Sequence, residues 1–455
     1  MKEISGKSIV IVGGARSGVA ASVLLKGMGA KVFVTDAGML SEQSRQTLIA
    51  QQIPFEEGGH SERAKDAEFV VVSPGVPDEA PLIRHFSYTG IPVYSEMEVA
   101  CWFNKSPLTA VTGSNGKTTT TSWLRHLWET ASKQALIAGN IGVPVSDLVL
   151  DTAPDKDLIL EVSSFQLDNI KTFRPRVSVI LNITPDHLNR YQNKFKYYVA
   201  SKMKIIRNQG ETDFLIYNYD DPVLKEQIGG IGVKPKGPAR IPFSLAEELE
   251  TGAFIRDEHI VVRLDGSEEV LMHKDEVSLK GPHNLANSLA VVLAGRLNGV
   301  ESSHIRESLR TFEGVEHRLE QVRILRGVRY INDSKATNVN AVWYALRGIT
   351  APVVLILGGQ DKGNNYRELT DQIRKKVHSL IAIGEAKAAI REQISREALY
   401  YFEAETMAQA VQQASKQARK GEVVLLSPAC ASFDMFENYE HRGRAFKEAV
   451  MDLPD

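Results

Sequence analysis

The segment from Val111 to Thr119, with the sequence VTGSNGKTT, constrains the fold of this 455-residue chain more than any other. A short apolar strand over Thr109–Val111 is expected to lead into a glycine-rich turn, and a helix over Lys117–Ala131 follows at once. Backbone N–H groups and a helix N-terminus then face one point, which is an anion-binding geometry. The pattern predicts a triphosphate site, with Lys117 on phosphate oxygens and the Thr118 hydroxyl on Mg²⁺. Val111 stands where the general motif has its first glycine, so an ordinary strand–helix turn is the alternative.

The rest of the chain alternates short apolar runs with longer amphipathic stretches, a pattern typical of βαβ units around parallel sheets. Strands are expected at Ile9–Val12, Lys31–Thr35, Phe69–Val72, Leu158–Val162, Val177–Leu181, Val353–Leu357 and Leu380–Ile383, and helices at Ser17–Met28, Lys194–Arg207, His283–Leu297 and Val339–Leu346. Breaks near residues 95 and 300 divide the chain into domains at 1–95, 96–300 and 301–455. The predicted class is α/β: a Rossmann-like N-terminal domain, a central P-loop ATPase-like domain with a mostly parallel sheet, and a C-terminal Rossmann-like α/β domain.

Composition excludes several classes of function. Lysine and arginine number 54 against 56 aspartate and glutamate, a net charge of −2, which argues against binding to nucleic acid or an anionic membrane. Two cysteines are too few for a disulfide framework or a structural zinc site. No apolar run is long enough for a signal peptide or a membrane span. We therefore expect a soluble, cytoplasmic protein.

A second glycine-rich turn, Gly13–Gly18, follows the first strand, and Asp36 closes the next one. The spacing is that of a dinucleotide-binding turn with an acid for the ribose. Ala15 occupies the position where a glycine normally lets a pyrophosphate approach the backbone. The turn is therefore either a weak nucleotide site or a purely structural connection.

Acidic and imidazole side chains stand at the ends of two central strands. Glu161 ends an otherwise apolar strand, where a carboxylate is costly to bury unless it is paired or bound to a metal. Asp186 and His187 follow the next apolar strand. Carboxyl ends of parallel strands share one edge of a sheet, so these groups and Lys117 are expected to form one Mg²⁺ and phosphate site.

Four polar segments follow strand ends or turns in the last third of the chain: Glu316–Arg318, Asn332–Asn338, Gly358–Gly363 and Ser427–Asp434. They are expected to converge on one rim of the C-terminal sheet. Lys335 and Lys362 are candidate anion-binding residues there, although a single lysine is more often a solvated surface charge. Cys430 is interpreted as a small buried residue rather than a nucleophile.

These motifs together resemble the Mur ligase family over essentially the whole chain. The segments that carry the resemblance are SPG at Ser73, TGSNGKTT, GN-IG at Asn140, EVSSFQL, NITPDHL, GPHNLAN, EHR, NDSKATN, LGGQDKG and LLSPACASFD. NDSKATN and SPACASFD are most similar to the D-glutamate-adding branch. The resemblance implies an ATP-dependent ligase of peptidoglycan precursor synthesis, which forms an amide between UDP-N-acetylmuramoyl-L-alanine and D-glutamate through an acyl phosphate. It also implies ATP, two Mg²⁺ ions, a monomer, and no nucleic-acid or membrane partner.

The resemblance also implies a role for each matching residue. Catalytic roles fall on Lys117, Asn140, His187 and Lys202, and metal ligation on Thr118, Glu161, His187 and a CO₂-derived carbamate on Lys202. ATP contacts fall on Gly113, Ser114, Asn115, Gly116, Lys117, Thr118, Thr119, Asn284, Asn287, His317, Arg318 and Asp333. The UDP-sugar would contact Arg16, Ser17, Asp36, Ser73, Gly75, Asn140 and His187, and D-glutamate would contact Lys335, Thr337, Lys362, Ser432, Phe433 and Tyr439.

Lys202 has two interpretations. Helical spacing puts it on the face of Tyr198 and Ile205 rather than on that of Lys204. Spacing alone favours a surface lysine that extends its ammonium group into solvent, whereas the resemblance implies a modified lysine near the metal.

Three rival functions stay open at this point. An NAD-dependent oxidoreductase would use Gly13–Asp36 and leave TGSNGKTT unexplained. A non-catalytic P-loop switch would bind nucleotide without releasing ADP in response to an amino acid. A folylpolyglutamate synthase would share the nucleotide loop and differ in its substrate.

Overall fold

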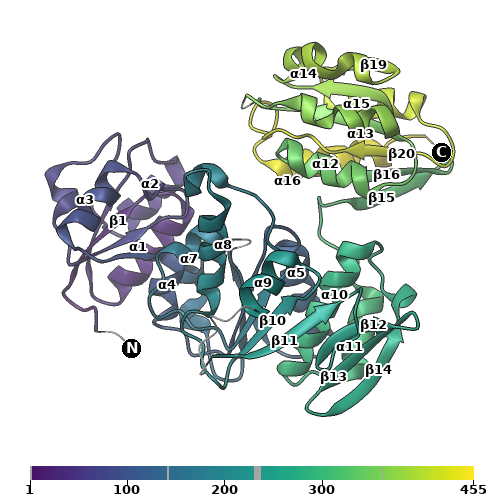
Figure 1. Cartoon of the computed structure of the whole chain (residues 1–455). Coiled ribbons are helices and arrows are strands. Elements are labelled where there is room, and N and C mark those ends of the chain that lie inside the picture. Colours follow the sequence, from purple (N-terminus) through teal and green to yellow (C-terminus); the bar gives the residue numbers. More distant parts are fainter. Residues whose placement is uncertain (1–2, 141–142, 230–236, 362, 455) are drawn as a thin grey trace. The chain divides into compact units, whose positions relative to one another are not determined.

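The computed structural model describes residues 3–140, 143–229, 237–361 and 363–454. The chain divides into two compact units, one that extends to Glu313 and one that begins at Gly314 (Figure 1). The first unit contains two separate sheets and the second contains one. The predicted α/β class is therefore confirmed at the level of the sheets.

The first sheet is parallel throughout, in the order β3-β2-β1-β4-β5. Its strands are β1 (Ser8–Val12), β2 (Lys31–Thr35), β3 (Phe55–Glu56), β4 (Phe69–Val72) and β5 (Val93–Ser95), and its helices are α1 (Arg16–Gly27), α2 (Glu42–Ala50), α3 (Pro81–Thr89) and α4 (Glu96–Cys101). All four residues of β4 are buried and apolar. Continuous apolar strands of this kind form parallel sheets that are covered on both faces.

The second sheet has nine strands in the order β14-β13-β12-β11-β10-β9-β6-β8-β7. The strands are β6 (Leu108–Thr112), β7 (Ala135–Gly139), β8 (Asp157–Glu161), β9 (Val177–Ile180), β10 (Phe214–Asn218), β11 (Ala239–Ser244), β12 (Gly252–Arg256), β13 (His259–Leu264) and β14 (Ser267–His273). The helices are α5 (Lys117–Thr130), α6 (Val145–Leu148), α7 (Ser164–Asp168), α8 (Phe195–Met203), α9 (Pro222–Gly229), α10 (Pro282–Leu297) and α11 (Ser302–Thr311). Among the described strands of this sheet, only the pairs β12–β13 and β13–β14 are antiparallel, so the mostly parallel sheet is confirmed.

The register of the second sheet brings its functional strand ends together. Val111 of β6 lies opposite Glu161 of β8, and Gly139 of β7 lies opposite the same glutamate. On the other side of β6, Thr112 lies opposite Ile180 of β9. The loops that follow these four strands therefore leave the sheet at one level, where ligands of open α/β sheets bind.

The second unit is built on six strands in the order β15-β16-β20-β17-β18-β19, and only β15 is antiparallel. The strands are β15 (Glu320–Leu325), β16 (Val328–Asn332), β17 (Val353–Gly358), β18 (Val377–Ile383), β19 (Tyr400–Ala404) and β20 (Val423–Leu426). The helices are α12 (Val339–Gly348), α13 (Thr370–Lys376), α14 (Lys387–Ile394), α15 (Met407–Gln417) and α16 (Tyr439–Met451).

The end of the first unit is fixed by aromatic packing. Helix α11 packs against α5, and the ring of Phe312 stacks on that of Trp123 with the ring centres 4.9 Å apart. Residues 302–312 therefore belong to the first unit. The boundaries predicted near residues 95 and 300 stay a prediction.

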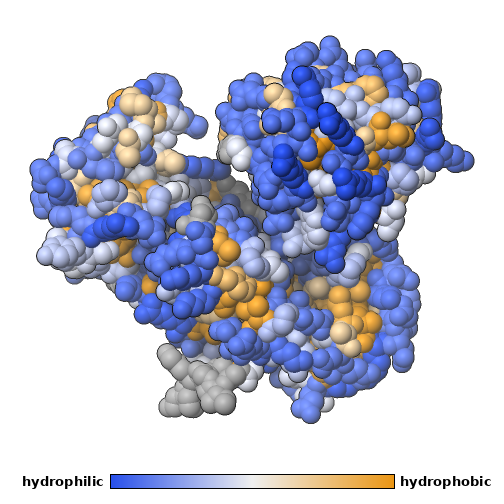
Figure 2. Space-filling view, turned by 45° about the horizontal axis from the view of Figure 1, so that its top comes forward, coloured by the Kyte–Doolittle hydropathy of each residue, from blue (hydrophilic) through white to orange (hydrophobic). Residues whose placement is uncertain are grey.

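The face in Figure 2 is mainly hydrophilic, with smaller areas of hydrophobic residues between. Within the described ranges, no helix combines the length and the apolar character that crossing a bilayer requires.

Gly18 and Gly27 of α1 provide a matched test of the first sheet's packing. A Cβ atom at Gly18 would lie 1.8 Å from the carbonyl oxygen of Gly13, whereas one at Gly27 would meet no atom within 4 Å. We expect Gly18→Ala to lower the free energy of unfolding by about 3 kcal/mol. Gly27→Ala should raise it by about 0.5 kcal/mol because alanine favours helix. Urea unfolding of the two variants checks this, and equal stability would contradict the close approach of α1 to the first turn.

Candidate functional site

The glycine-rich loop lies between β6 and α5 and is held by residues that follow β9. The N–H of Ser114 donates to the carbonyl of Asn182 (2.9 Å), and the Ser114 hydroxyl donates to the carbonyl of Thr184 (2.8 Å). The N–H of Asn115 donates to the side-chain oxygen of Asn182 (2.8 Å). These bonds shape the loop before any ligand arrives.

Gly116 shows why this loop needs a glycine. Its φ is +85°, and a Cβ atom there would lie 2.7 Å from the side-chain oxygen of Asn287 in α10. The glycine-rich loop therefore approaches α10 closely, and Asn287 lies beside it.

Two lysine side chains meet at one carbonyl oxygen. Lys117 Nζ donates to the carbonyls of Gly113 (2.8 Å) and Ser114 (2.9 Å). Lys202 Nζ donates to the same Gly113 oxygen (2.8 Å), and it lies 4.8 Å from the centre of the Tyr198 ring. Burial, followed by the charge of Lys117, holds the pKa of Lys202 well below 10.5.

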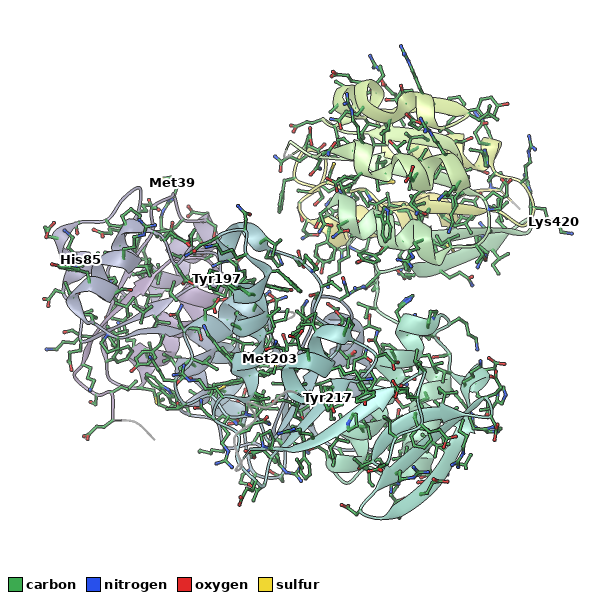
Figure 3. All side chains as sticks on the ribbon, viewed as in Figure 1. Met39, His85, Tyr197, Met203, Tyr217 and Lys420 are labelled. Carbon is green, nitrogen blue, oxygen red and sulfur yellow. The ribbon has the colours of Figure 1, made fainter. Side chains whose placement is uncertain are left out.

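Lys202 and Tyr198 are each 1% exposed, and Ile205 is 0% exposed. The shared face predicted from the spacing is confirmed. The surface interpretation of Lys202 is wrong, because α8 presents this face to the core. Its Tyr197 and Met203 are labelled in Figure 3. Lys204 lies on another face and pairs with Asp168 (2.7 Å).

Glu161 ends β8 and is 1% exposed. Its Oε1 accepts a hydrogen bond from the side chain of Asn140 (2.9 Å), and its carbonyl accepts one from the Asn140 N–H (2.9 Å). Its Oε2 is buried without a hydrogen-bond partner in the part of the chain that the structure describes. A buried, unpartnered carboxylate oxygen is costly and is a hard ligand suited to Mg²⁺, so the site fits a cation.

His187 follows β9 in a left-handed conformation with φ +50°. Its side chain is 54% exposed, and Nε2 lies 3.7 Å from Asp186 Oδ2. Partial removal of the ring from water lowers the pKa of His187 below 6.5, and the positive charges of Lys117 and Lys202 act in the same direction. The ring is therefore neutral at pH 7 and can act as a ligand or a hydrogen-bond acceptor.

The turns of the first sheet are braced by the residues expected to bind the UDP-sugar. Asp36 accepts hydrogen bonds from the N–H groups of Gly14 (2.7 Å) and Gly38 (2.8 Å), one on each carboxyl oxygen. The Ser73 hydroxyl donates to the carbonyl of Gly13 (2.6 Å). Arg16 and Gly75 are exposed beside these turns, and Ser17 is half-buried.

Arg190 was not predicted from the sequence. Its guanidinium donates to the carbonyls of Pro74 (2.8 Å) and Val76 (2.9 Å), and it lies 4.8 Å from the centre of the Phe165 ring. It thereby ties the loop after β9 to the turn after β4. Local sequence carries no signal for this tie, because the two carbonyls that accept its hydrogen bonds are more than 100 residues away.

In the second unit, Asp333 is buried after β16. It accepts hydrogen bonds from the Ser427 hydroxyl (2.7 Å) and the Leu319 N–H (3.2 Å). Burial raises the pKa of Asp333 to about 7. His317 is 2% exposed, and its Nδ1 lies 2.9 Å from the side-chain nitrogen of Asn332.

Arg442 of α16, also absent from the predictions, joins two loops of the second unit. It is 1% exposed and donates to the hydroxyl (3.0 Å) and carbonyl (2.8 Å) of Ser334 and to the carbonyls of Cys430 and Ala431 (both 3.1 Å). The predicted NDSKATN and SPACASFD loops are thus held by one guanidinium. An arginine in an amphipathic helix gives no local sign of such burial.

Comparisons with known proteins fit this geometry. Residues 8–81 match the MurD N-terminal domain, 111–295 the Mur ligase middle domain, and 317–430 the Mur ligase glutamate ligase domain. Proteins named UDP-N-acetylmuramoylalanine–D-glutamate ligase are similar over 99% of this chain and 99% of their own length. The example from Salinibacter ruber is 47% identical and that from Chlorobium limicola is 46% identical. The chain belongs to the UDP-N-acetylmuramoylalanine–D-glutamate ligase family.

Solved structures of other Mur ligases share the fold. The UDP-N-acetylmuramate–alanine ligase MurC of Thermotoga maritima is 18% identical, covers 98% of this chain and 99% of its own, and has a TM-score of 0.59. The MurF ligase of Thermotoga maritima in complex with ADP is 15% identical, covers 92% and 95%, and has a TM-score of 0.58. The family resemblance and the three-domain α/β architecture expected from the sequence are therefore confirmed, and this Mur ligase is an enzyme.

Within each unit, the structure brings together many of the residues predicted for this Mur ligase. In the first unit, Gly113–Thr119, Asn140, Glu161, His187, Lys202 and Asn287 lie around the carboxyl end of the second sheet, while Asn284 donates to the carbonyl of Lys280 (2.9 Å) at the start of α10. In the second unit, His317, Asp333 and Ser432 are buried, Arg318, Lys335 and Tyr439 are half-buried, and Thr337 and Phe433 are exposed. Lys362 lies outside the described residues.

Cys430 is 1% exposed, and burial raises the pKa of its thiol to about 11, which agrees with the prediction of a buried, unreactive side chain.

The burial of Lys202 predicts a conflict between stability and function. We expect Lys202→Met to raise the free energy of unfolding of the ligand-free, CO₂-free protein by about 2 kcal/mol at pH 7, because an amine is no longer buried. The unfolded state binds the proton up to pH 10.5, and the folded state loses it at lower pH. The difference between the variant and the wild type should therefore shrink as the pH rises towards 10.5. Urea unfolding at several pH values checks this, and a less stable variant would contradict it.

Proposed function

We propose that this chain joins D-glutamate to the L-alanyl carboxyl group of UDP-N-acetylmuramoyl-L-alanine, with conversion of ATP to ADP and phosphate. The observation that carries the proposal is the 42–47% identity to D-glutamate ligases over nearly the full length. ATP and UDP-linked precursors are cytoplasmic solutes, so the proposed place of action is the cytoplasm. The expected monomer stays a prediction.

The chemistry has two steps. A carboxylate is a poor electrophile because attack on it would have to expel oxide. Transfer of the ATP γ-phosphoryl group gives an acyl phosphate, and the amine of D-glutamate then attacks the acyl carbon and expels phosphate. Such transfer is catalysed mainly by positioning and by neutralisation of charge.

The glycine-rich loop supports the first step. Backbone N–H groups of Gly113–Thr119 and the start of α5 would face the phosphates, and Lys117 would exchange its bonds to the loop carbonyls for bonds to phosphate oxygens. Asn140 and His187 would lie beside the substrate carboxylate.

Thr118, Glu161 and His187 are the proposed Mg²⁺ ligands. The unpartnered Oε2 of buried Glu161 supports this assignment. Mg²⁺, proposed as two ions, would supply charge neutralisation on the phosphates. The chain's own contribution is a fixed set of oxygen and nitrogen donors at one edge of the sheet.

We further propose that Lys202 carries a carbamate. Its neutral amine would attack CO₂, forming an N–C bond and releasing one proton. The product offers two anionic oxygens in place of a cation, and such oxygens are hard ligands. Burial and the neighbouring Lys117 favour the neutral amine that this reaction needs.

The remaining proposed contacts divide between the substrates. Arg16, Ser17, Asp36, Ser73 and Gly75 would hold the UDP-sugar, and the bonds of Asp36 and Ser73 to neighbouring backbone support the shape of those turns. Asn284, Asn287, His317, Arg318 and Asp333 are assigned to ATP, and Lys335, Thr337, Lys362, Ser432, Phe433 and Tyr439 to D-glutamate. Cations suit a dicarboxylate substrate.

ADP release with a panel of amino acids and muramoyl precursors tests the function. D-Glutamate with the L-alanyl precursor should be the only pair that releases ADP. With that pair, Lys117→Ala should lower the turnover of the enzyme by more than about 10²-fold, because a cation at the transferring phosphoryl group is lost. Equal turnover with L-alanine, a diamino acid or a folate acceptor would refute the proposal.

Chemical rescue tests the carbamate. We expect Lys202→Ala to be nearly inactive and to regain part of its activity in millimolar acetate, because a small carboxylate can replace the missing oxygens. Lys204→Ala is the matched control, because Lys204 lies two residues further on, just past the end of α8, and outside the buried face. This variant should neither lose comparable activity nor respond to acetate. A fully active Lys202→Ala variant would end this assignment.

A further inference from the structure

Two loops of the second unit contain residues assigned above to D-glutamate. The β17 loop, described at residues 359–361 and 363–365, follows β17, and the β20 loop, residues 427–434, follows β20. Their backbones are paired: the N–H of Gln360 donates to the carbonyl of Ala431 (2.9 Å), and the N–H of Gly358 donates to that of Pro428 (2.8 Å). The two loops therefore form one continuous rim at the carboxyl end of neighbouring strands.

A buried phenol stands beneath this rim. Tyr366 is 0% exposed, and its hydroxyl lies 3.1 Å from Asp361 Oδ1 and 2.9 Å from Cys430 Sγ. Its own N–H donates to the side-chain oxygen of Gln393 in α14 (2.8 Å), which fixes the backbone at this point. The phenol thus contacts one side chain from each loop.

The directions of these hydrogen bonds follow from the available protons. A carboxylate can only accept, so the phenol proton goes to Asp361 and the Cys430 thiol donates to the phenol oxygen. Burial raises the pKa of both the phenol and the thiol, so both keep their protons at neutral pH. The result is a directed chain from Cys430 through Tyr366 to Asp361.

Asn364 supports the same arrangement. Its N–H donates to Asp361 Oδ1 (3.2 Å), and its side chain donates to the carbonyl of Ala429 in the β20 loop (3.2 Å). Asp361 is thus held by two donors, and it is the residue immediately before Lys362 in the sequence.

We propose that Tyr366 is a positioning residue for D-glutamate: its hydroxyl fixes Asp361, and with it the β17 loop, against the β20 loop. The inference rests on the proposed function, which assigns Lys362, Ser432 and Phe433 of these loops to D-glutamate. A preorganised loop does not have to be ordered when the substrate binds, so it binds more tightly. The ring of Tyr366 belongs to the apolar core of the unit, and only its hydroxyl has the positioning role.

Steady-state kinetics of the full-length enzyme tests this inference. Tyr366→Phe keeps the ring and removes the hydroxyl, and we expect it to raise the KM for D-glutamate about ten-fold, a loss of about 1.4 kcal/mol, with kcat and the KM for ATP changed less than about two-fold. Tyr401→Phe is the matched control, because it removes another phenol of the same unit, bonded to Glu403 (2.7 Å). It should leave all three constants unchanged.

A double-mutant cycle asks whether the hydroxyl acts through Asp361. Asp361→Ala removes the acceptor of the phenol proton and should also raise the KM for D-glutamate. The double variant Asp361→Ala/Tyr366→Phe should be no worse than the more impaired of the two single variants. Additive effects would overturn the inference, as would a fall in kcat with the KM for D-glutamate unchanged.

Lys362→Ala distinguishes a failure of the Tyr366 inference from a failure of the proposed D-glutamate pocket. If it raises the KM for D-glutamate while Tyr366→Phe does not, positioning by Tyr366 is wrong and the pocket assignment stands. If neither variant raises it, the assignment of the β17 loop to D-glutamate is wrong, and the inference falls with it.

Discussion

The carbonyl oxygen of Gly113 accepts hydrogen bonds from two lysines, Lys117 and Lys202, each at 2.8 Å. Two ammonium groups that share one acceptor repel each other, and burial of Lys202 makes its charged form still less favourable. The neighbouring elements produce this arrangement: Gly113 directly follows β6, Lys117 is the first residue of α5, and Lys202 lies on the buried face of α8. The same crowding prepares the site for anions, because phosphate oxygens and a carbamate would both remove the repulsion.

Each unit also retains a buried polar atom that has no hydrogen-bond partner among the described residues. Glu161 Oε2 in the first unit and His317 Nε2 in the second are both buried without a hydrogen-bond partner among the residues that the structure describes. Each such group costs stability. Seven other buried side-chain atoms among these residues also lack a partner, and five of them are hydroxyl oxygens. A buried carboxylate and a buried imidazole are more costly to leave unpartnered than a hydroxyl, and a ligand would satisfy them. Both belong to motifs that sequence alone had singled out.

Much of the fold and part of the site could be predicted from the sequence because their signals are local. Continuous apolar strands such as Phe69–Val72, and the glycine turn before Lys117, appear in the structure within one or two residues of their predicted bounds. Helical spacing also placed Lys202 on the face of Tyr198. The contacts of Arg190, Tyr366 and Arg442 were missed because they join segments that are distant in the chain. The burial of Lys202 was missed for a related reason: periodicity defines a face but does not say what covers it.

Detection of the proposed carbamate on Lys202 tests the central claim most directly. The protein is equilibrated with ¹³C-labelled bicarbonate and its ¹³C NMR spectrum is compared with those of Lys202→Met and Lys204→Ala. The account predicts a protein-bound carbamate resonance in the wild type that persists in Lys204→Ala and is lost in Lys202→Met. A wild-type spectrum without this resonance, or one that Lys202→Met leaves unchanged, would contradict the claim that the buried amine beside Gly113 is built to take up CO₂.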